Sequence, residues 1–151
     1  MQQGKITVGI YGAAGYTGAE LITILAQHPH VALTFATSNQ DAGQQIPGTR
    51  LAYQPHDAVS PASVDAVFLA LPHTASAPVA AQAKAAGTRV IDLSADLRLD
   101  TPESYKAWYD VDHPAPELLP APYGLPETNR AAIKGATLVA NPGCYPTATL
   151  L

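Results

Sequence analysis

The chain has 151 residues, of which 47% are hydrophobic and 13% are charged, and 8 Lys and Arg against 12 Asp and Glu give a formal charge of −4. This length suits one globular domain, and so low a charged fraction excludes a coiled coil or a charge-driven disordered chain. The scattered Lys and Arg residues form no basic patch for nucleic acid or for an anionic membrane, so we expect a small molecule as the partner.

Residues 6–37 predict a βαβ unit. A β-branched apolar run over residues 6–11 ends at a glycine cluster, and residues 19–26 follow at helical spacing. Pro29 stops the helix, and residues 31–37 predict a second strand. The length of this connection requires a right-handed crossover between two parallel strands.

Residues 38–63 interrupt the pattern with Gln, Gly, Pro and Asp, and we expect a long surface connection that holds a short helix or an edge strand. The predicted elements beyond it are a strand over 66–71, a helix over 76–86 closed by Gly87, a strand over 89–92, a helix from the Thr101 cap towards Tyr109, a helix over 127–134 and a strand over 137–140. The Pro-rich residues 113–126 predict irregular chain. This alternation predicts an α/β fold with a doubly wound, mainly parallel sheet.

The last residues form an apolar turn. Pro146 is expected to open a helix, but too few residues follow it for a helix to stand alone. We therefore expect that the chain is cut here.

The composition also predicts the compartment. The single cysteine, Cys144, cannot form an internal disulfide, and without a Cys/His cluster we expect no metal site. No signal-peptide core is present, and no apolar run approaches the roughly 20 residues that cross a bilayer. A cytoplasmic protein that does not enter membranes is expected.

The glycine-rich residues 12–18, GAAGYTG, lie between a predicted strand and a predicted helix. Gly12, Gly15 and Gly18 let the backbone turn tightly and approach a pyrophosphate, whose charge the helix N-terminus attracts. We assign Tyr16 and Thr17 to the same cofactor site. A turn that only packs the helix on the strand is the alternative.

Residues 36–39, ATSN, indicate which dinucleotide binds. An NAD site usually has Asp or Glu about 20 residues beyond the glycine turn, on the ribose 2′-hydroxyl. Ser38 and its neutral neighbours would tolerate a 2′-phosphate, which favours NADP over NAD. Arg50 would supply a positive charge to the 2′-phosphate if its loop folds back towards residues 36–39. The alternative is that Arg50 is a solvated loop residue.

Cys144 lies between a strand end and a helix start, in residues 141–147, NPGCYPT. A thiol at a helix N-terminus ionises more readily, and the free N–H groups there can stabilise an oxyanion. We therefore interpret it as a nucleophile and place Asn141 and Gly143 at its substrate. The alternative is a buried structural cysteine.

Three further candidates follow other strands. Pro72 and His73 come after the strand over 66–71, at the edge where open α/β sheets bind ligands, so we expect both at the cofactor. Capping of the next helix is the alternative for His73.

Arg98 would clamp a carboxylate or phosphate of the substrate, or pair with Asp96 or Asp100 at the surface. The other four histidines are expected at the surface: His28, His30, His56 and His113.

Five segments of the chain resemble, in this order, the N-acetyl-gamma-glutamyl-phosphate reductases of arginine biosynthesis: residues 12–20, 71–73, 92–98, 123–127 and 141–147. The resemblance spans essentially the whole chain, and GCYPT is its most specific element. It implies an NADP-dependent reductase with Cys144 as nucleophile and residues 12–18 as cofactor turn. The family usually has a lysine where this chain has Gln44.

The resemblance also implies a longer protein. Residues 1–151 would be the dinucleotide-binding domain, with the start of the catalytic-cysteine segment at about 140–151. The missing part is a substrate and dimerisation domain that carries the acid/base histidine, so a homo-oligomer is expected at full length.

The implied reaction reduces N-acetyl-L-glutamyl 5-phosphate to the 5-semialdehyde with release of phosphate, through a thioester on Cys144. Two alternatives remain. Aspartate-semialdehyde dehydrogenases share the chemistry but typically have Asn-Cys-Ser or Asn-Cys-Thr at the nucleophile. A non-catalytic NAD(P)-binding module would make Cys144 incidental.

Overall fold

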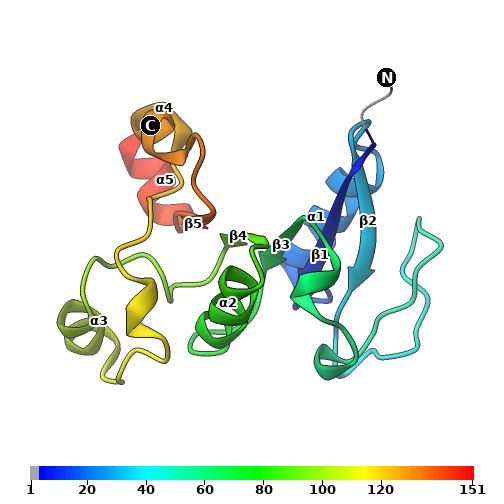
Figure 1. Ribbon diagram of the computed structural model, residues 1–151, viewed down its shortest axis with the longest axis horizontal. Coiled ribbons are helices and arrows are strands. Elements are labelled where there is room, and N and C mark those ends of the chain that lie inside the picture. The colour runs from blue at the N-terminus through cyan, green and yellow to red at the C-terminus, as the bar shows by residue number, and fades with distance from the viewer. Residues whose placement is uncertain (1–3) are drawn as a thin grey trace.

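Five parallel strands form the central sheet of this computed structural model, which describes residues 4–151 (Figure 1). The strands are β1 (Ile6–Tyr11), β2 (Val31–Ala36), β3 (Ala66–Leu69), β4 (Arg89–Asp92) and β5 (Leu138–Ala140). Their order in the sheet is β2-β1-β3-β4-β5. The predicted doubly wound parallel sheet is therefore confirmed.

The strand order places the site. From β1 the chain moves to β2 on one side and then returns to β3 on the other side of β1. Connections that leave neighbouring strands in opposite directions open a crevice at the carboxyl ends of those strands. The crevice here lies above the ends of β1 and β3, where the glycine-rich turn follows β1.

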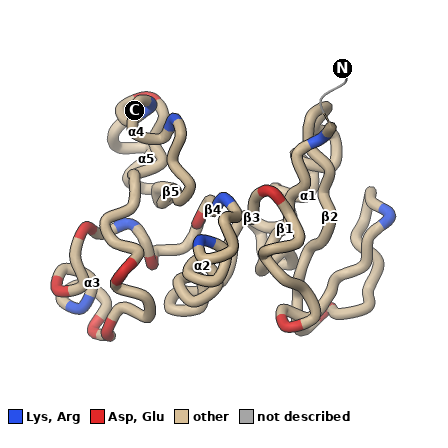
Figure 2. Tube along the Cα trace, in the orientation of Figure 1, with Lys and Arg blue, Asp and Glu red and all other residues tan. Residues whose placement is uncertain are grey.

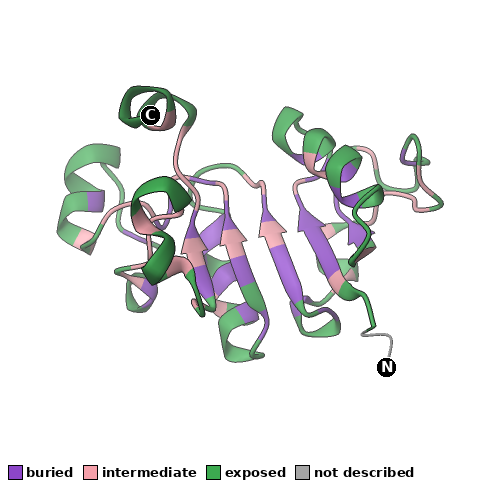
Figure 3. Ribbon diagram, turned by 90° about the horizontal axis from the view of Figure 1, so that it is seen from above, coloured by how far each residue is buried: buried purple, intermediate pink, exposed green. Residues whose placement is uncertain are grey.

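Helices pack on both faces of the sheet, because successive strand residues point to opposite sides. The helices are α1 (Tyr16–Ala26), α2 (Ser76–Ala85), α3 (Pro102–Tyr109), α4 (Pro126–Ile133) and α5 (Cys144–Leu150). On one face Ile22 and Leu25 of α1 pack in a cluster with Val8 of β1. On the other face three alanines of α2 pack in a cluster with Val67 and Leu69 of β3. Figure 3 shows buried residues running along the strands beneath these helices.

Three helices begin earlier than the sequence predicts, and α4 does so by a single residue, at Pro126. Helix α1 begins at Tyr16, since Gly15 is its extended N-cap, with φ −72° and ψ 166°. Helix α5 begins at Cys144 rather than at Pro146, and the Thr147 N–H donates to the Gly143 carbonyl oxygen at 3.1 Å. Pro146 fits the first turn because an N–H at that position would have no partner inside the helix.

The long connection over 38–63 folds back onto the sheet. It contains two short 3₁₀ helices, His56–Ala58 and Pro61–Ser63. Thr37 pairs with Gln54 in a parallel bridge, which lays the second half of the connection beside the end of β2. This pairing positions residues that the sequence pattern left undefined.

The segments after β4 agree with their predicted character. The Thr101 hydroxyl caps α3 by accepting the Ser104 N–H at 3.1 Å, as predicted. The Pro-rich residues are irregular apart from one 3₁₀ turn, Pro116–Leu118, and a single bridge from Tyr123 to Ala140.

Candidate functional site

The glycine-rich turn is held between the ends of three strands. Gly12 has φ +77°, and a Cβ there would lie 2.4 Å from the Ala70 carbonyl oxygen after β3. Its N–H donates to Thr37 Oγ1 at 3.2 Å, and the Ala13 N–H donates to the Thr37 carbonyl oxygen at 2.8 Å. A Cβ on Gly18 would lie 2.5 Å from Ala13 Cα, so this glycine lets α1 press against the turn. Only glycine fits these two positions without a shift of backbone.

A hollow of about 430 Å³, here called the turn hollow, opens beside this turn. Its lining residues are Gly12, Ala14, Gly15, Ser38, Asn39, Gln40, Asp41, His56, Ala70, Leu71 and Pro72. Four predicted cofactor residues, Gly12, Gly15, Ser38 and Pro72, thus meet in one place. Tyr16 is 98% exposed and lines neither this hollow nor the one at Cys144.

Asp41 brings a carboxylate to the turn hollow. The Ser38 hydroxyl donates to Asp41 Oδ2 at 2.9 Å, and Gln44 Nε2 donates to Oδ1 at 3.2 Å. The corner after β2 was expected to be neutral because residues 36–39 contain no acid. That premise is wrong, because the chain turns back and returns the carboxylate of Asp41 to Ser38.

His56 also lines the turn hollow, although it was expected at the surface. Its Nδ1 lies 2.6 Å from Thr37 Oγ1, and its backbone N–H donates to Asn39 Oδ1 at 2.9 Å. Burial lowers the pKa of the His56 imidazole, which therefore stays neutral at neutral pH. No local signal marks this residue, since the bridge between Thr37 and Gln54 carries it there.

A second hollow of about 680 Å³, the cysteine hollow, lies at the start of α5. Its lining residues are Thr17, Leu93, Arg98, Asn141, Pro142, Gly143, Cys144, Thr147, Ala148 and Leu151. Cys144 is exposed at the first position of α5, which argues against the alternative of a buried structural cysteine. The structure thus brings the predicted nucleophile and the predicted substrate residues together.

Arg98 ties the loop before Cys144 to the loop after β4. Its Nε donates to the Asn141 carbonyl oxygen at 2.9 Å, and its Nη2 donates to the Leu93 carbonyl oxygen at 2.7 Å. A Cβ on Gly143 would lie 3.0 Å from Nη1, so the glycine leaves room for the guanidinium. These contacts replace the surface pairing with an acidic residue that was the alternative for Arg98.

His73 lines neither hollow, so its place at the cofactor stays a prediction. Its Nδ1 lies 3.2 Å from Asp96 Oδ1, and its ring packs on Tyr109 with the centroids 4.5 Å apart. Asp96 is fully buried and accepts the N–H groups of Thr74 and Ala77 at 2.8 and 3.0 Å. Asp96, not His73, therefore satisfies the first turn of α2.

The N-terminal turn of α1 is shared by the two hollows. Gly15 lines the turn hollow, and Thr17, two residues on, lines the cysteine hollow. A ligand that extends across the start of α1 would therefore reach from Asp41 at one end towards Cys144 at the other. The chemistry suits a dinucleotide, because the glycines expose backbone and the helix N-terminus favours a pyrophosphate.

The remaining charges are dispersed. Figure 2 shows Lys and Arg scattered over the chain without a patch of one sign. Arg50 is exposed and lines a separate hollow with Lys5 and Gly48, so it brings no charge to the turn hollow. Across residues 4–151 no cluster of His, Cys, Asp and Glu is arranged to hold a metal ion, and no helix there has the length and apolarity needed to cross a membrane.

Comparison with known proteins agrees with this geometry. The family model described as "Semialdehyde dehydrogenase, NAD binding domain" matches residues 7–136. Relatives named N-acetyl-gamma-glutamyl-phosphate reductase from Azotobacter vinelandii and Magnetococcus marinus are 50% and 49% identical, each over 97% of this chain and 45% of the relative. The chain thus spans slightly less than half the length of these curated relatives.

Solved structures show the same fold. Aspartate semialdehyde dehydrogenase II from Vibrio cholerae, complexed with ASA, matches 97% of this chain and 44% of its own with a TM-score of 0.71 and 22% identity. The Rex-family repressor RSP matches 97% of this chain and 57% of its own with a TM-score of 0.56 and 11% identity. The fold is therefore shared by an enzyme and a repressor, and function has to be argued from the site.

Proposed function

Because this chain belongs to the semialdehyde dehydrogenase family, of which it forms the NAD-binding domain, we propose that it is the dinucleotide-binding part of an N-acetyl-gamma-glutamyl-phosphate reductase. That enzyme would reduce N-acetyl-L-glutamyl 5-phosphate to the 5-semialdehyde in arginine biosynthesis. The observation that carries the proposal is the exposed Cys144 at the start of α5, in one hollow with Thr17 of the cofactor turn.

The chain's own residues would hold the cofactor along the start of α1. Gly12 and Gly15 present backbone to the pyrophosphate, while Ser38 and Pro72 border the adenosine half of the turn hollow. When bound, the reduced nicotinamide supplies a hydride to the reacting carbon. NADP is the cofactor that the resemblance implies, whereas Asp41 does not suit its 2′-phosphate.

Cys144 would provide the nucleophile. The Cys144 sulfur forms a bond to the acyl carbon, the bond from that carbon to the phosphate oxygen breaks, and phosphate leaves with the electron pair. After hydride reaches the carbonyl carbon of the thioester, the tetrahedral adduct collapses. The carbon–sulfur bond then breaks, which releases the aldehyde and returns the thiolate.

The backbone around Cys144 would stabilise the negative oxygen formed in both steps. The N–H groups of Cys144 and Tyr145 open α5 and have no helical carbonyl to bond, while Pro146 has no N–H. Arg98 holds this loop in place through the Asn141 carbonyl, and its Nη1 beside Gly143 remains in the cysteine hollow for an anionic group of the substrate.

The rest of the enzyme belongs to the same proposal. The curated relatives are more than twice as long as this chain, and a further domain would close the cysteine hollow and supply the acid/base group. The complete protein would be a cytoplasmic homo-oligomer that acts on a small-molecule substrate.

The full-length enzyme tests the assignment. Cys144→Ser should retain dinucleotide binding and lose at least about a thousandfold in turnover, because a serine hydroxyl without a base is too weakly ionised to replace the thiolate. Thr149→Ser is the matched control, since Thr149 lies on α5 outside the cysteine hollow. Steady-state rates with N-acetylglutamyl phosphate and with aspartyl phosphate separate the reductase from an aspartate-semialdehyde dehydrogenase.

A non-catalytic binding module would behave differently. It would bind dinucleotide without reducing either acyl phosphate, and its thiol would react with iodoacetamide no faster than a free cysteine near neutral pH. Either result would contradict the proposed reaction.

A further inference from the structure

We propose that Asp41 sets the cofactor specificity of this site, and that it makes NADH a better ligand than NADPH. The inference rests on one part of the proposed function, which is that the turn hollow binds a nicotinamide dinucleotide. It concerns the adenosine end of that ligand, where the two cofactors differ by a single phosphate on the ribose 2′-oxygen.

The position of Asp41 is the first observation. Its carboxylate is half-buried at the end of β2 and lines the turn hollow with Gly12 and Gly15. In βαβ dinucleotide sites an acid at the end of the second strand accepts a hydrogen bond from the ribose 2′-hydroxyl. Asp41 lies five residues beyond the last residue of β2. The Ser38 hydroxyl nevertheless donates a hydrogen bond to its carboxylate at 2.9 Å, which keeps the carboxylate near the end of the strand.

The second observation concerns charge: within residues 4–151, no positively charged side chain forms an ion pair with this carboxylate. Its side-chain partners, the Ser38 hydroxyl and the Gln44 amide, are both neutral. Among the residues that the structure describes, no Lys or Arg lines the turn hollow. Arg50 lines a different hollow, and Arg98 is committed to backbone carbonyls beside Cys144.

His56 does not supply a cation either. It is the one other titratable side chain in the lining of the turn hollow, and its burial disfavours the charged form. Its Nδ1 lies 2.6 Å from the Thr37 hydroxyl, which also accepts the Gly12 N–H. The imidazole is therefore a neutral hydrogen-bonding group in the wall of the hollow.

The chemistry follows from these charges. A 2′-phosphate carries close to two negative charges at neutral pH, and it would meet Asp41 with no cation to offset the repulsion. A 2′-hydroxyl instead donates a hydrogen bond to the carboxylate, which is stronger than one to a neutral acceptor. Both effects favour NADH.

The experiment measures dissociation constants of NADH and NADPH for the full-length protein by titration of dihydronicotinamide fluorescence. The wild type should bind NADH more tightly, and Asp41→Asn should shift the ratio of the two constants towards NADPH by roughly tenfold or more. Gln44→Lys, which places a cation on Asp41, should tighten NADPH and leave NADH nearly unchanged. AMP and adenosine 2′,5′-bisphosphate, used as competitors, should show the same shifts, because they differ only in the 2′-phosphate.

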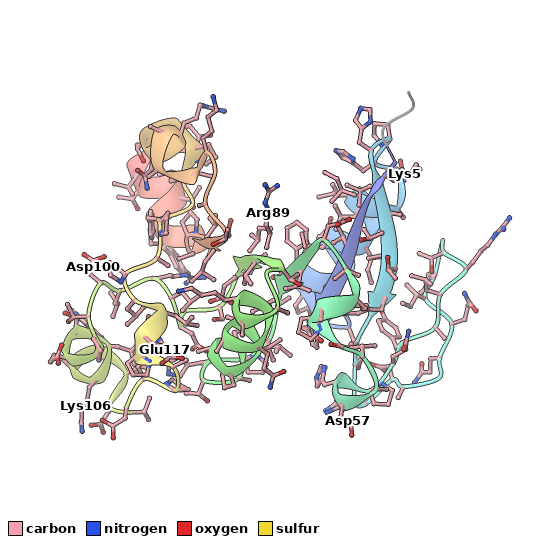
Figure 4. All side chains as sticks on the ribbon, in the orientation of Figure 1. Lys5, Asp57, Arg89, Asp100, Lys106 and Glu117 are labelled. Atoms are coloured by element: carbon pink, nitrogen blue, oxygen red, sulfur yellow. The ribbon has the colours of Figure 1, made fainter. Side chains whose placement is uncertain are left out.

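Asp100→Asn is the matched control. It removes the same charge from an exposed residue. Figure 4 shows Asp100 far from Asp57, which is the neighbour of His56 in the sequence and marks the side of the turn hollow. This variant should leave the ratio unchanged.

The outcomes separate the two proposals. Tighter binding of NADPH by the wild type, or an Asp41→Asn variant that weakens both cofactors equally, overturns the specificity role of Asp41 and leaves the reductase assignment intact. A folded protein that binds neither cofactor overturns the dinucleotide site itself, and with it both proposals.

Discussion

At the scale of single residues, Thr37 links the parts of the cofactor turn. Its side chain and backbone are fully buried at the end of β2. Its hydroxyl accepts the Gly12 N–H and contacts His56, while its backbone N–H donates to the Ile10 carbonyl oxygen at 2.9 Å. The position of the glycine turn therefore depends on the neighbouring strand as well as on its own sequence.

The close approach at Gly12 gives the first residue-scale prediction. Gly12 and Gly87 both have a φ of +77°. The Cβ of Gly12→Ala would lie 2.4 Å from the Ala70 carbonyl oxygen, whereas the Cβ of Gly87→Ala would have no heavy atom within 4 Å. Both variants should lose about 1–2 kcal/mol from the left-handed backbone. Gly12→Ala should lose more because backbone must move, and it alone should weaken dinucleotide binding. Urea denaturation and cofactor titration measure the two effects, and equal losses would contradict the close approach.

The second residue-scale prediction concerns pH. Burial lowers the pKa of His56 in the folded protein below the ordinary value of 6.5. Between the lowered pKa of the folded protein and 6.5, His56 binds more protons in the unfolded chain than in the folded protein. The free energy of unfolding therefore falls as the pH drops through that window. In urea melts at pH 7.5 to 5.5, His56→Gln should lose less stability on acidification than the wild type. His30→Gln, at an exposed position, should follow the wild type. Parallel curves for the wild type and His56→Gln would contradict the lowered pKa of this half-buried imidazole.

At the scale of elements, Asp96 joins two helices. It accepts the Thr74 and Ala77 N–H groups at the start of α2 and the Tyr105 hydroxyl, from α3, at 3.0 Å. His73 lies against the same carboxylate. Helix α2 has no side-chain cap at its own N-cap residue, so this distant carboxylate supplies what the local sequence lacks.

Loss of this carboxylate should destabilise both helices together. Asp96→Ala leaves the Thr74 and Ala77 N–H groups without an acceptor and leaves the Tyr105 hydroxyl only the His73 ring as a partner, which should cost about 3 kcal/mol in the free energy of unfolding. Asp100→Ala removes an exposed carboxylate four residues further along the chain and should change little. Thermal and urea denaturation provide the measurement. A small effect at Asp96 would mean that water or another group satisfies the start of α2.

At the scale of the whole molecule, the two hollows lie at one edge of a single sheet. The strand order places the turn after β1 next to the ends of β2 and β3, and the crossing from β4 to β5 places Cys144 beyond them. The start of α1 connects the hollows through Gly15 and Thr17. The proposed cofactor site and the proposed nucleophile thus both lie on this chain.

The prediction at this scale is that residues 1–151, expressed alone, bind a dinucleotide but do not reduce N-acetylglutamyl phosphate. The cysteine hollow is open and Cys144 is exposed, so substrate would not be closed off from water or oriented. Activity assays on the purified chain, with cofactor titration as the control for folding, decide the matter. Turnover on the order of 10 per second, as in an ordinary enzyme, would show that the site is complete without a second domain.

The sequence by itself determined the features that arise from neighbouring residues. The apolar runs predicted every strand, the glycines between β1 and α1 predicted the cofactor turn, and Cys144 was placed between a strand end and a helix start. These predictions succeed because strand burial, tight turns and helix initiation depend on residue types a few positions apart.

Only the tertiary structure decided which groups meet at the two hollows. Asp41 and His56 come from a connection without periodicity. The hydrogen bond from the Ser38 hydroxyl holds Asp41 at the turn hollow, and the pairing of Thr37 with Gln54 brings His56 there. Arg98 donates hydrogen bonds to carbonyl groups of two loops, and His73 lies against Asp96. Such contacts depend on which strand ends are neighbours in the sheet, and hydrogen bonds between residues far apart in the chain leave no local pattern in the sequence.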